Sequence, residues 1–295
     1  LLLSAIIGLV FLPNVNEIRK VSIDILSVIL STLGFGGIVY GVSVAGEHGW
    51  TSTIVITSII VGVIALILFS LRQTKMENPM LNLTAFKYPL FVLGVVMSFI
   101  TFFNMLSLLV VLPMYMQMAL LMLAFTTGLV LLPGSLLNCI LAPTIGLMFD
   151  KFGPKAVITP GTIFVVIGYI LYASFGTDTA TWLLVVTHII MMLGIGMVLA
   201  STQTNTLNSL PREYYPDGIA LTQTVQQVAG AMGIAIMVSV LSAKQSSYLT
   251  TVNDNLAEAT ASGSSFVFTL GLILAIVNLV LSLFMKKPGE VKLKG

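Results

Sequence analysis

The chain has 295 residues, of which 57% are hydrophobic and only 8% are charged, and its formal net charge is +2. Soluble domains carry about 25% charged residues because their surface faces water, so most of this surface must face lipid. Since lipid cannot satisfy open backbone donors and acceptors, the composition predicts an all-α polytopic membrane protein.

Several functional classes are excluded by the residue types. The basic residues form no cluster with interleaved aromatics, so no nucleic-acid partner is expected. Cys139 is the single cysteine, and it supports neither a disulfide nor a cysteine metal site. The apolar runs contain no His-Glu-x-x-His motif, no Gly-x-Ser-x-Gly motif and no paired aspartates. We therefore expect no metal, no cofactor and no enzymatic activity.

The first apolar run is LLLSAIIGLVFL, residues 1–12. It is shorter than the roughly 20 residues that a membrane span needs, and it lacks the basic flank of a signal peptide. We interpret it as the end of a truncated transmembrane helix, which would make the chain the C-terminal portion of a longer protein. The alternative is a short interfacial segment.

Eight further apolar runs are long enough to span a bilayer as helices. They cover residues 22–45, 51–71, 88–116, 122–149, 155–176, 180–203, 219–242 and 264–285. When the loops are assigned alternately to two sides, twelve of the thirteen lysines and arginines fall on one side and only Lys244 on the other. Cytoplasmic loops carry such an excess. The linker 72–87, the turn around Asp150 and the tail 286–295 are therefore predicted to be cytoplasmic.

Two further patterns concern the interior of these runs. All eleven Asp and Glu residues fall in loops or at span ends. Proton and cation relays usually use carboxylates inside a span, so a proton-carrying residue is expected upstream of this chain. Gly37-x-x-x-Gly41, in the first run, predicts close helix packing.

The turn GLMFDKFGPK, residues 146–155, concentrates charge in a chain that otherwise avoids it. Its notable residues are Gly146, Asp150, Lys151, Gly153 and Lys155. Gly146 would let a neighbouring backbone approach, and Gly153 can adopt a positive φ. The plain interpretation is a basic cytoplasmic turn. The alternative is a latch, in which Asp150 accepts hydrogen bonds from an adjacent helix N-terminus in one conformation.

The pattern Gly-x-x-x-Asp-Lys-x-Gly-x-Lys resembles the signature loop of the major facilitator superfamily, which joins the second and third helix of each six-helix half. Here it joins the second and third predicted helices of the block 88–285. VVLPMYMQMALLMLAFTTGLVLLPGSLL (110–137) and PDGIALTQTVQQVAGAMGIAI (216–236) resemble the fourteen-span branch of drug:proton antiporters. The resemblance implies a major facilitator fold, with 22–71 as an inserted helix pair and 88–285 as the C-terminal six-helix half. Leu147 departs from the pattern, because the family often has a basic or polar residue there.

The resemblance also implies a function. The chain would belong to a secondary transporter in the plasma membrane of a bacterium, exporting hydrophobic or cationic small molecules by alternating access, with the proton gradient as driving force. Its partners would be membrane lipid and the missing N-terminal half of the same protein. Two alternatives stay open, namely a transporter of a defined metabolite and a non-transporting membrane subunit.

Cargo of such transporters is expected near the middle of the membrane, between the halves. Polar side chains inside spans are the candidate binding residues, because an unpaired amide in lipid is costly. The candidates are Asn104, Tyr115, Gln117, Asn138, Gln223, Gln226 and Gln227. The last three share one helical face with Gly230, which also suits helix–helix packing.

Asn104 is the best single candidate for the cavity, with a structural hydrogen bond as the alternative. Phenylalanines and methionines surround it, and such adaptable apolar surfaces suit promiscuous binding. Most of them are nevertheless expected to face lipid or to pack between helices.

Other polar residues have open interpretations. Tyr115 and Gln117 could form an outer gate, or an aromatic-belt anchor and an exposed amide. His188, the only histidine within a span, could handle protons or simply pack. Gln203 and Asn205 lie near a cytoplasmic span end, where a loop role is expected.

Overall fold

The computed structural model describes residues 24–76, 81–252, 254–287 and 289, and all regular structure within these residues is helical. The long helices are α2 (Ile25–His48), α3 (Thr53–Lys75), α4 (Pro89–Met118), α5 (Ala124–Phe152), α6 (Pro154–Ala173), α7 (Thr181–Asn208), α8 (Tyr215–Thr251) and α9 (Leu256–Ser282). Two short 3-10 helices, η1 (Leu83–Lys87) and η2 (Arg212–Tyr214), precede α4 and α8. All eight long helices could cross a membrane by length and composition, which confirms the eight predicted spans. Residues 1–12 lie outside the described residues.

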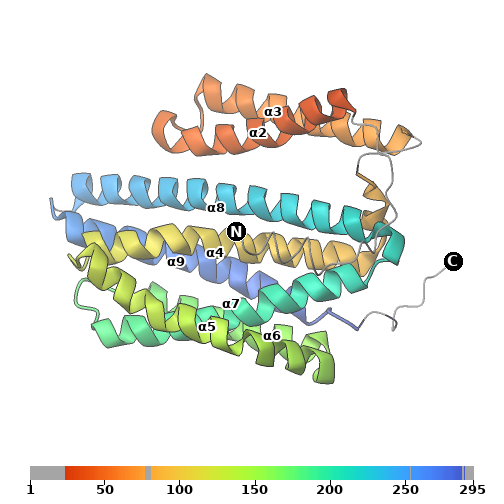
Figure 1. Ribbon diagram of the computed structural model, residues 1–295. Coiled ribbons are helices and arrows are strands. Elements are labelled where there is room, and N and C mark those ends of the chain that lie inside the picture. Colours follow the sequence, from red (N-terminus) through yellow and green to blue (C-terminus); the bar gives the residue numbers. More distant parts are fainter. Residues whose placement is uncertain (1–23, 77–80, 253, 288, 290–295) are drawn as a thin grey trace, which may run out of the picture.

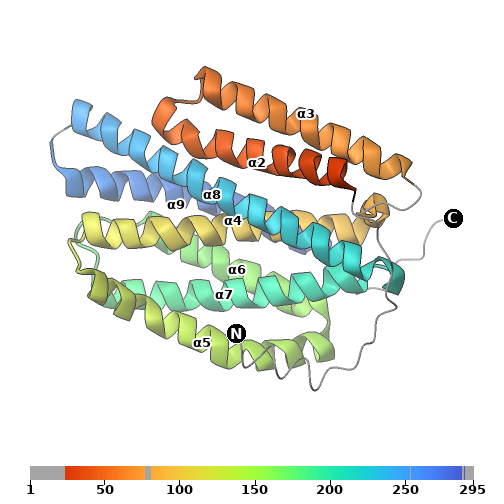
Figure 2. The same ribbon diagram turned by 45° about the horizontal axis from the view of Figure 1, so that its top comes forward.

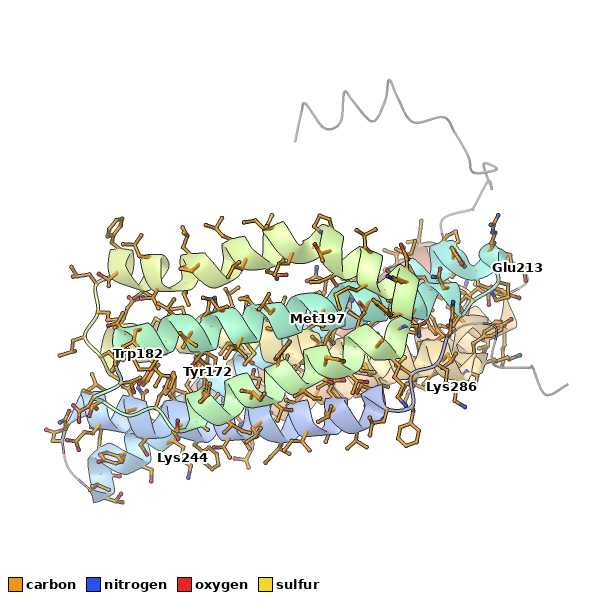
Figure 3. All side chains as sticks on the ribbon, turned by 90° about the horizontal axis from the view of Figure 1, so that it is seen from below. Tyr172, Trp182, Met197, Glu213, Lys244 and Lys286 are labelled. Carbon is orange, nitrogen blue, oxygen red and sulfur yellow. The ribbon has the colours of Figure 1, made fainter. Side chains whose placement is uncertain are left out.

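The helices form a bundle, α4–α9, with an α2–α3 hairpin beside it (Figure 1). The hairpin packs along α8, and α8 in turn packs on α4 and α9 (Figure 2). Glu213 and Lys286 lie at one end of the bundle, whereas Trp182 and Lys244 lie at the other (Figure 3). We call these the basic end and the distal end. The arrangement agrees with the alternation of basic loops in the sequence.

The helix starts follow recognisable local signals. Pro89 and Pro154 stand in the first turns of α4 and α6, where the missing N–H has no intrahelical partner to lose. Ser52 caps α3 by accepting from the amide of Val55 at 3.4 Å. Asn255 caps α9 by accepting from the amide of Ala257 at 3.0 Å. Each cap satisfies an otherwise open donor of the first turn.

The turn 146–155 is shorter than predicted. Helix α5 continues to Phe152, so Asp150 and Lys151 lie on its last turn rather than in a loop. Gly153 alone separates α5 from α6, and its φ of 84° is a conformation that glycine adopts without strain. The charged side chains did not end the helix, because side chains at a helix terminus can reach the headgroup region while the backbone remains helical.

The predicted loop 243–263 is mostly helical, which corrects the span limits. Helix α8 runs to Thr251 and α9 begins at Leu256. Polar side chains hold the two helices together beyond the apolar segment, as where Gln245 donates to the Thr260 hydroxyl at 2.7 Å. The hydrophobic pattern marks the lipid-facing length of a helix, whereas backbone hydrogen bonding continues past it.

Large side chains fill the distal half of the bundle core. Tyr115, Tyr172 and Phe268 are almost completely buried there, and Phe175 is 5% exposed. The rings of Tyr172 and Phe268 lie 5.2 Å apart, and those of Tyr172 and Phe175 lie 5.4 Å apart, edge to face. Such pairs add about 0.5–1.5 kcal/mol each beyond the area they bury, so this cluster fixes α4, α6 and α9 together.

Two helix contacts depend on glycine because the backbones approach closely. A Cβ on Gly233 of α8 would collide with the carbonyl oxygen of Phe103 in α4. A Cβ on Gly37 of α2 would lie 2.9 Å from the carbonyl oxygen of Ser58 in α3. The second contact confirms the close packing predicted from Gly37-x-x-x-Gly41.

Candidate functional site

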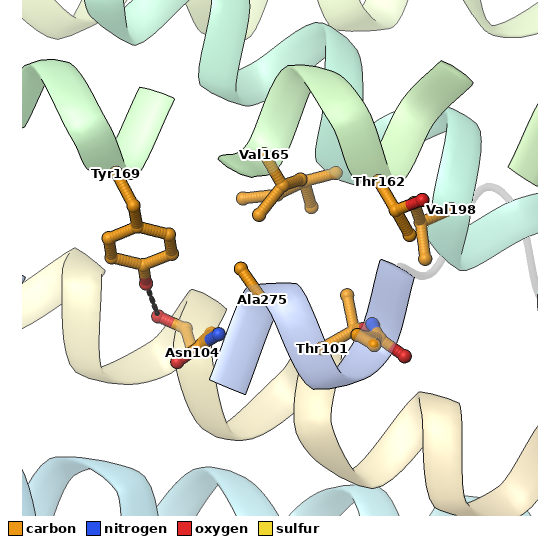
Figure 4. Close-up of a pocket in the computed structure, with 9 residues that line it drawn as sticks. Thr101, Asn104, Thr162, Val165, Tyr169, Val198 and Ala275 are labelled. Carbon is orange, nitrogen blue, oxygen red and sulfur yellow. Dashed lines mark hydrogen bonds between the residues drawn. The ribbon is translucent and has the colours of Figure 1, made fainter. Parts of the chain in front are cut away.

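A small cavity, lined by both polar and apolar side chains, lies inside the bundle between α4, α6, α7 and α9 (Figure 4). Its walls include Thr101, Asn104, Thr162, Tyr169 and Asn278. It has about 10 Å³ available to the centre of a water-sized sphere, which is about the space that one water needs. Drug-sized ligands occupy pockets of roughly 300–1,000 Å³, so this cavity is not a cargo site in the conformation described.

Asn104 faces this interior and is 4% exposed. Its amide Nδ2 donates to the carbonyl oxygen of Gly271 in α9 at 3.2 Å. The hydroxyl of Tyr169 in α6 donates to the backbone carbonyl of Asn104 at 3.1 Å. These bonds tie α4 to its neighbours, so the geometry favours the structural alternative for Asn104, and cargo contact stays a prediction.

Asn278 of α9 completes the interior polar set and was missed at the sequence level. It is 5% exposed, and its Nδ2 donates to the Thr101 hydroxyl at 2.9 Å. Its Oδ1 and that of Asn104 have no hydrogen-bond partner among the described residues. The sequence did contain a signal for this residue, because the amide side chain of Asn278 interrupts the otherwise apolar run GLILAIVNLVLS.

The glutamines of α8 do not share one environment. Gln226 is 6% exposed, whereas Gln223 and Gln227 are exposed. Gly230 is also buried, and a Cβ there would collide with Leu106 of α4. The predicted common face is therefore divided: Gln226 and Gly230 belong to the packed side, and Gln223 and Gln227 remain open to contact.

Tyr115 is an anchor in this conformation. Its side chain is buried, and its hydroxyl donates to the carbonyl oxygen of Gly176 at 2.6 Å. It also lies 2.9 Å from the Thr179 hydroxyl. These contacts fasten the α6–α7 turn to α4, while Gln117 is exposed on the last turn of α4. The geometry favours the anchor alternative over a gate.

Asn138 lies on α5, half-buried and next to α7. A Cβ on Gly196 of α7 would overlap its amide oxygen, so the two helices approach closely at this point. Pro133 and Pro143 lie on either side within α5, and each removes one backbone hydrogen bond of the helix. Asn138 is thus both a packing residue and partly accessible.

Two further polar residues have structural surroundings. His188 is 6% exposed, and its Nδ1 lies 3.3 Å from the Tyr172 hydroxyl. Within the described residues it forms no ion pair with a carboxylate, so packing is favoured over proton handling. Asn205 lies within α7 rather than in a loop, and its Nδ2 donates to the carbonyl oxygen of Lys286 at 3.3 Å. Gln203 lies on the same helix.

The signature residues gather at the basic end. Gly146, Asp150, Lys151 and Lys155 are exposed. Nothing comes within 4 Å of a Cβ on Gly146, so the close approach predicted for it is not seen among the described residues. In the same part of the chain Asp150 forms no ion pair.

Charge is confined to the helix ends. The charged side chains of the described helices lie in the first or last two turns, except for Lys244 in the distal part of α8. In the described part of the chain, no group of three or more His, Cys, Asp or Glu side chains could hold a metal ion. The walls available to cargo are thus built from apolar side chains, amides and hydroxyls.

Comparison with known proteins gives a consistent result. Residues 3–234 match the family model "Major Facilitator Superfamily". The chain is 46% identical over 294 residues to the lincomycin resistance protein LmrB of Bacillus subtilis (strain 168), covering 97% of this chain and 61% of that protein. It is 44% identical over 291 residues to LmrB of Listeria innocua, covering 97% and 62%. It is 36% identical over 283 residues to the uncharacterized MFS-type transporter YcnB of Bacillus subtilis, covering 96% and 59%.

The chain therefore spans less than two thirds of the length of these relatives. The family match covers most of the chain, and the eight apolar helices agree with it. The expectation that the chain is not an enzyme agrees with relatives named as resistance proteins and transporters. The chain belongs to the Major Facilitator Superfamily.

Proposed function

We propose that the chain is part of a proton-coupled drug exporter that acts on lincomycin and on other apolar or cationic compounds by alternating access. The observation that carries this proposal is the 46% identity to a lincomycin resistance protein over 97% of the chain. Residues 88–285 would form the C-terminal half, 22–71 an inserted pair, and an N-terminal half would complete the transport path.

The cargo surface would combine open amides with apolar side chains. Gln223 and Gln227 are exposed on α8, and Asn138 is half-buried on α5. Phe102 and Met105 of α4 are partly buried against the core and keep some accessible surface. Flexible apolar side chains with a few hydrogen-bonding groups suit cargo of varied shape.

The distribution of charged residues supports export of drugs rather than transport of an amino acid or another metabolite with a carboxylate. The carboxylate of such a substrate would need a basic partner in the wall, and the central parts of the described helices carry no Lys or Arg. A cationic drug can instead lie against aromatic rings. We infer that the proton-carrying group lies in the rest of the protein, because carboxylates that carry protons usually lie inside a span and the central parts of the described helices have none. The basic end would be cytoplasmic, in the plasma membrane of a bacterium.

The experiment is a resistance assay. The complete protein is expressed in a bacterium that lacks its own lincomycin exporters, and growth is scored against lincomycin, ethidium and a quaternary ammonium compound. We expect several-fold lower lincomycin susceptibility than in cells with the empty vector, and Gln227→Ala should lose part of this protection. Unchanged susceptibility, with the protein shown to be inserted in the membrane, would contradict the proposal.

Asp150 would act as the latch of one transport state through a partner in the rest of the protein. We expect Asp150→Asn to lower the transport rate several-fold while expression and insertion stay intact. Asp178→Asn is the matched control, because Asp178 is also exposed but lies in the α6–α7 turn. Wild-type transport by the Asp150→Asn variant would exclude the latch.

A further inference from the structure

The α4–α5 turn at the distal end is apolar throughout. Leu121, Leu123 and Phe125 are 78%, 75% and 77% exposed, and they are the most exposed large hydrophobic side chains of the described residues. Residues 111–149 contain no charged side chain and no histidine. A turn that stood in water would be expected to carry polar residues, so this turn differs in kind from an ordinary aqueous loop.

The α6–α7 turn, at the same end of the bundle, provides the contrast. Its exposed residues are Ser174, Gly176, Thr177, Asp178 and Ala180. Its backbone is held by a side chain, since the amide of Gly176 donates to the Thr179 hydroxyl at 3.0 Å. This turn has the composition expected in water. The apolar character of the α4–α5 turn is therefore specific to that turn and not a property of the whole distal end.

Two backbone amides of the α4–α5 turn donate hydrogen bonds back to carbonyl groups of α4. The amide of Met122 donates to the carbonyl of Met116 at 3.0 Å, and the amide of Leu120 donates to the carbonyl of Tyr115 at 3.3 Å. Between them, Leu121 has a φ of 54°, the one positive φ of a non-glycine residue in the described part of the chain. Polar backbone groups satisfied in this way can leave water at lower cost.

A leucine at position 121 indicates that its side chain contacts an apolar environment outside the described residues. Glycine or asparagine usually takes the left-handed conformation after a helix, because a bulkier side chain is strained there. A leucine that is both strained and exposed has no internal contact that compensates for the strain. An apolar environment outside the described residues would supply that compensation.

We propose that the α4–α5 turn binds the membrane, with Leu121, Leu123 and Phe125 inserted in the interfacial layer of the distal leaflet. Lipid fits better than another protein surface because exposed leucines continue along α5 one turn apart from Phe125, at Leu129, Leu132 and Leu136, as on a helix face that meets the bilayer. Trp182, 67% exposed at the same end, is of the type enriched at membrane interfaces. Leu123 gives α5 no side-chain cap, so the first amides of α5 suit the hydrated headgroup layer better than the hydrocarbon centre.

The test measures what surrounds the turn. The complete protein, with Cys139→Ser and any other cysteine removed, receives a single cysteine by Leu123→Cys, and a nitroxide label is attached. In proteoliposomes, collision of the label with oxygen and with a water-soluble nickel chelate is recorded. Thr177→Cys is the matched control in the α6–α7 turn, expected in water, and Leu129→Cys, at an exposed position within the apolar part of α5, is the control expected in lipid.

We expect the ratio of oxygen to nickel accessibility at position 123 to be several-fold higher than at 177 and close to that at 129. A ratio equal to that at 177 would place the turn in water and overturn the proposal. Low accessibility to both reagents would show that protein covers the turn, which would overturn it equally. Leu121→Gly provides a second measurement, because it removes the strain together with the apolar side chain. Proteoliposomes with this variant should lose nickel protection at the position 123 label.

Discussion

The α2–α3 hairpin and the α4–α9 bundle are both apolar, yet they are held together in different ways. In the most apolar part of α4, 61% of the residues are buried, against 22% in α2 and 17% in α3, although α5 at the edge of the bundle is also only 17% buried. The bundle buries a cluster of aromatic rings, whereas the hairpin joins mainly along a stripe of glycines that includes Gly34 and Gly37 and buries one aromatic ring, Phe69, and one amide, Gln73. Hydrophobicity alone does not separate a core helix from a lipid-facing one. The small and polar residues do.

The hairpin concentrates its polar contacts at the basic end. Arg72 donates to Asp24 through Nε at 2.7 Å and through a terminal nitrogen at 3.1 Å. Gln73 donates to the Ser27 hydroxyl at 2.7 Å and accepts from the amide of Leu81 at 3.1 Å. These contacts join α2, α3 and the start of the segment that leads to the bundle, so polar bonds hold the hairpin at this end and close glycine contacts hold it along its length.

The largest effect is expected in the bundle, at Gly233. In Gly233→Ala the new methyl group would collide with the Phe103 carbonyl, so the packed backbones of α4 and α8 would have to separate. We expect a loss of about 3 kcal/mol in the free energy of unfolding, measured by thermal denaturation in detergent. Wild-type stability would show that the α4–α8 contact is not as tight as described.

A smaller effect is expected at the equivalent contact of the hairpin. Gly37→Ala would place a methyl group 2.9 Å from the Ser58 carbonyl, but most apolar side chains of α3 are exposed, so α3 can move away. We expect a loss of about 1–2 kcal/mol. Gly36→Ala is the control, because nothing lies within 4 Å of its Cβ position and alanine favours the helix by about 1 kcal/mol. Equal losses at positions 37 and 233 would contradict the comparison.

The next largest effect on stability is expected at Tyr115, whose hydroxyl joins α4 to the α6–α7 turn. Tyr115→Phe keeps the stacked ring but removes the hydroxyl that donates to Gly176 at 2.6 Å. We expect a loss of about 1 kcal/mol in unfolding free energy and faster proteolysis of the α6–α7 turn. If transport fails while stability is unchanged, the gate interpretation of Tyr115 would replace the anchor.

The smallest effect is expected from the ion pair of the hairpin. Hydrogen bonding from Arg72 holds the pKa of Asp24 well below its usual range. A lowered pKa adds stability above the unfolded-state value of about 3.9, and this stability is lost only as the pH falls through the folded-state value. Asp24→Asn should therefore shift the melting temperature by the same small amount at every pH from 5 to 8. A shift that changes within that range would exclude this account of the pair.

The sequence allowed the fold to be predicted better than the environment of each polar residue. The number of spans follows from uninterrupted apolar runs, and the basic residues fix which ends lie together. The continuation of α8 to Thr251 could not be predicted, because it depends on contacts such as Gln245 with Thr260. The separation of Gln226 from Gln227 depends on which part of α8 meets α4, and helical spacing alone does not specify that.

The most direct test of the central claim uses the complete protein in everted membrane vesicles that carry an imposed pH gradient, followed by a pH-sensitive dye. Lincomycin, ethidium and a panel of amino acids are added in turn. Proton release from the vesicles on addition of lincomycin, absent in vesicles without the protein, is the result that proton-coupled drug export predicts. No response to lincomycin or to cationic drugs, together with a response to one amino acid, would contradict it.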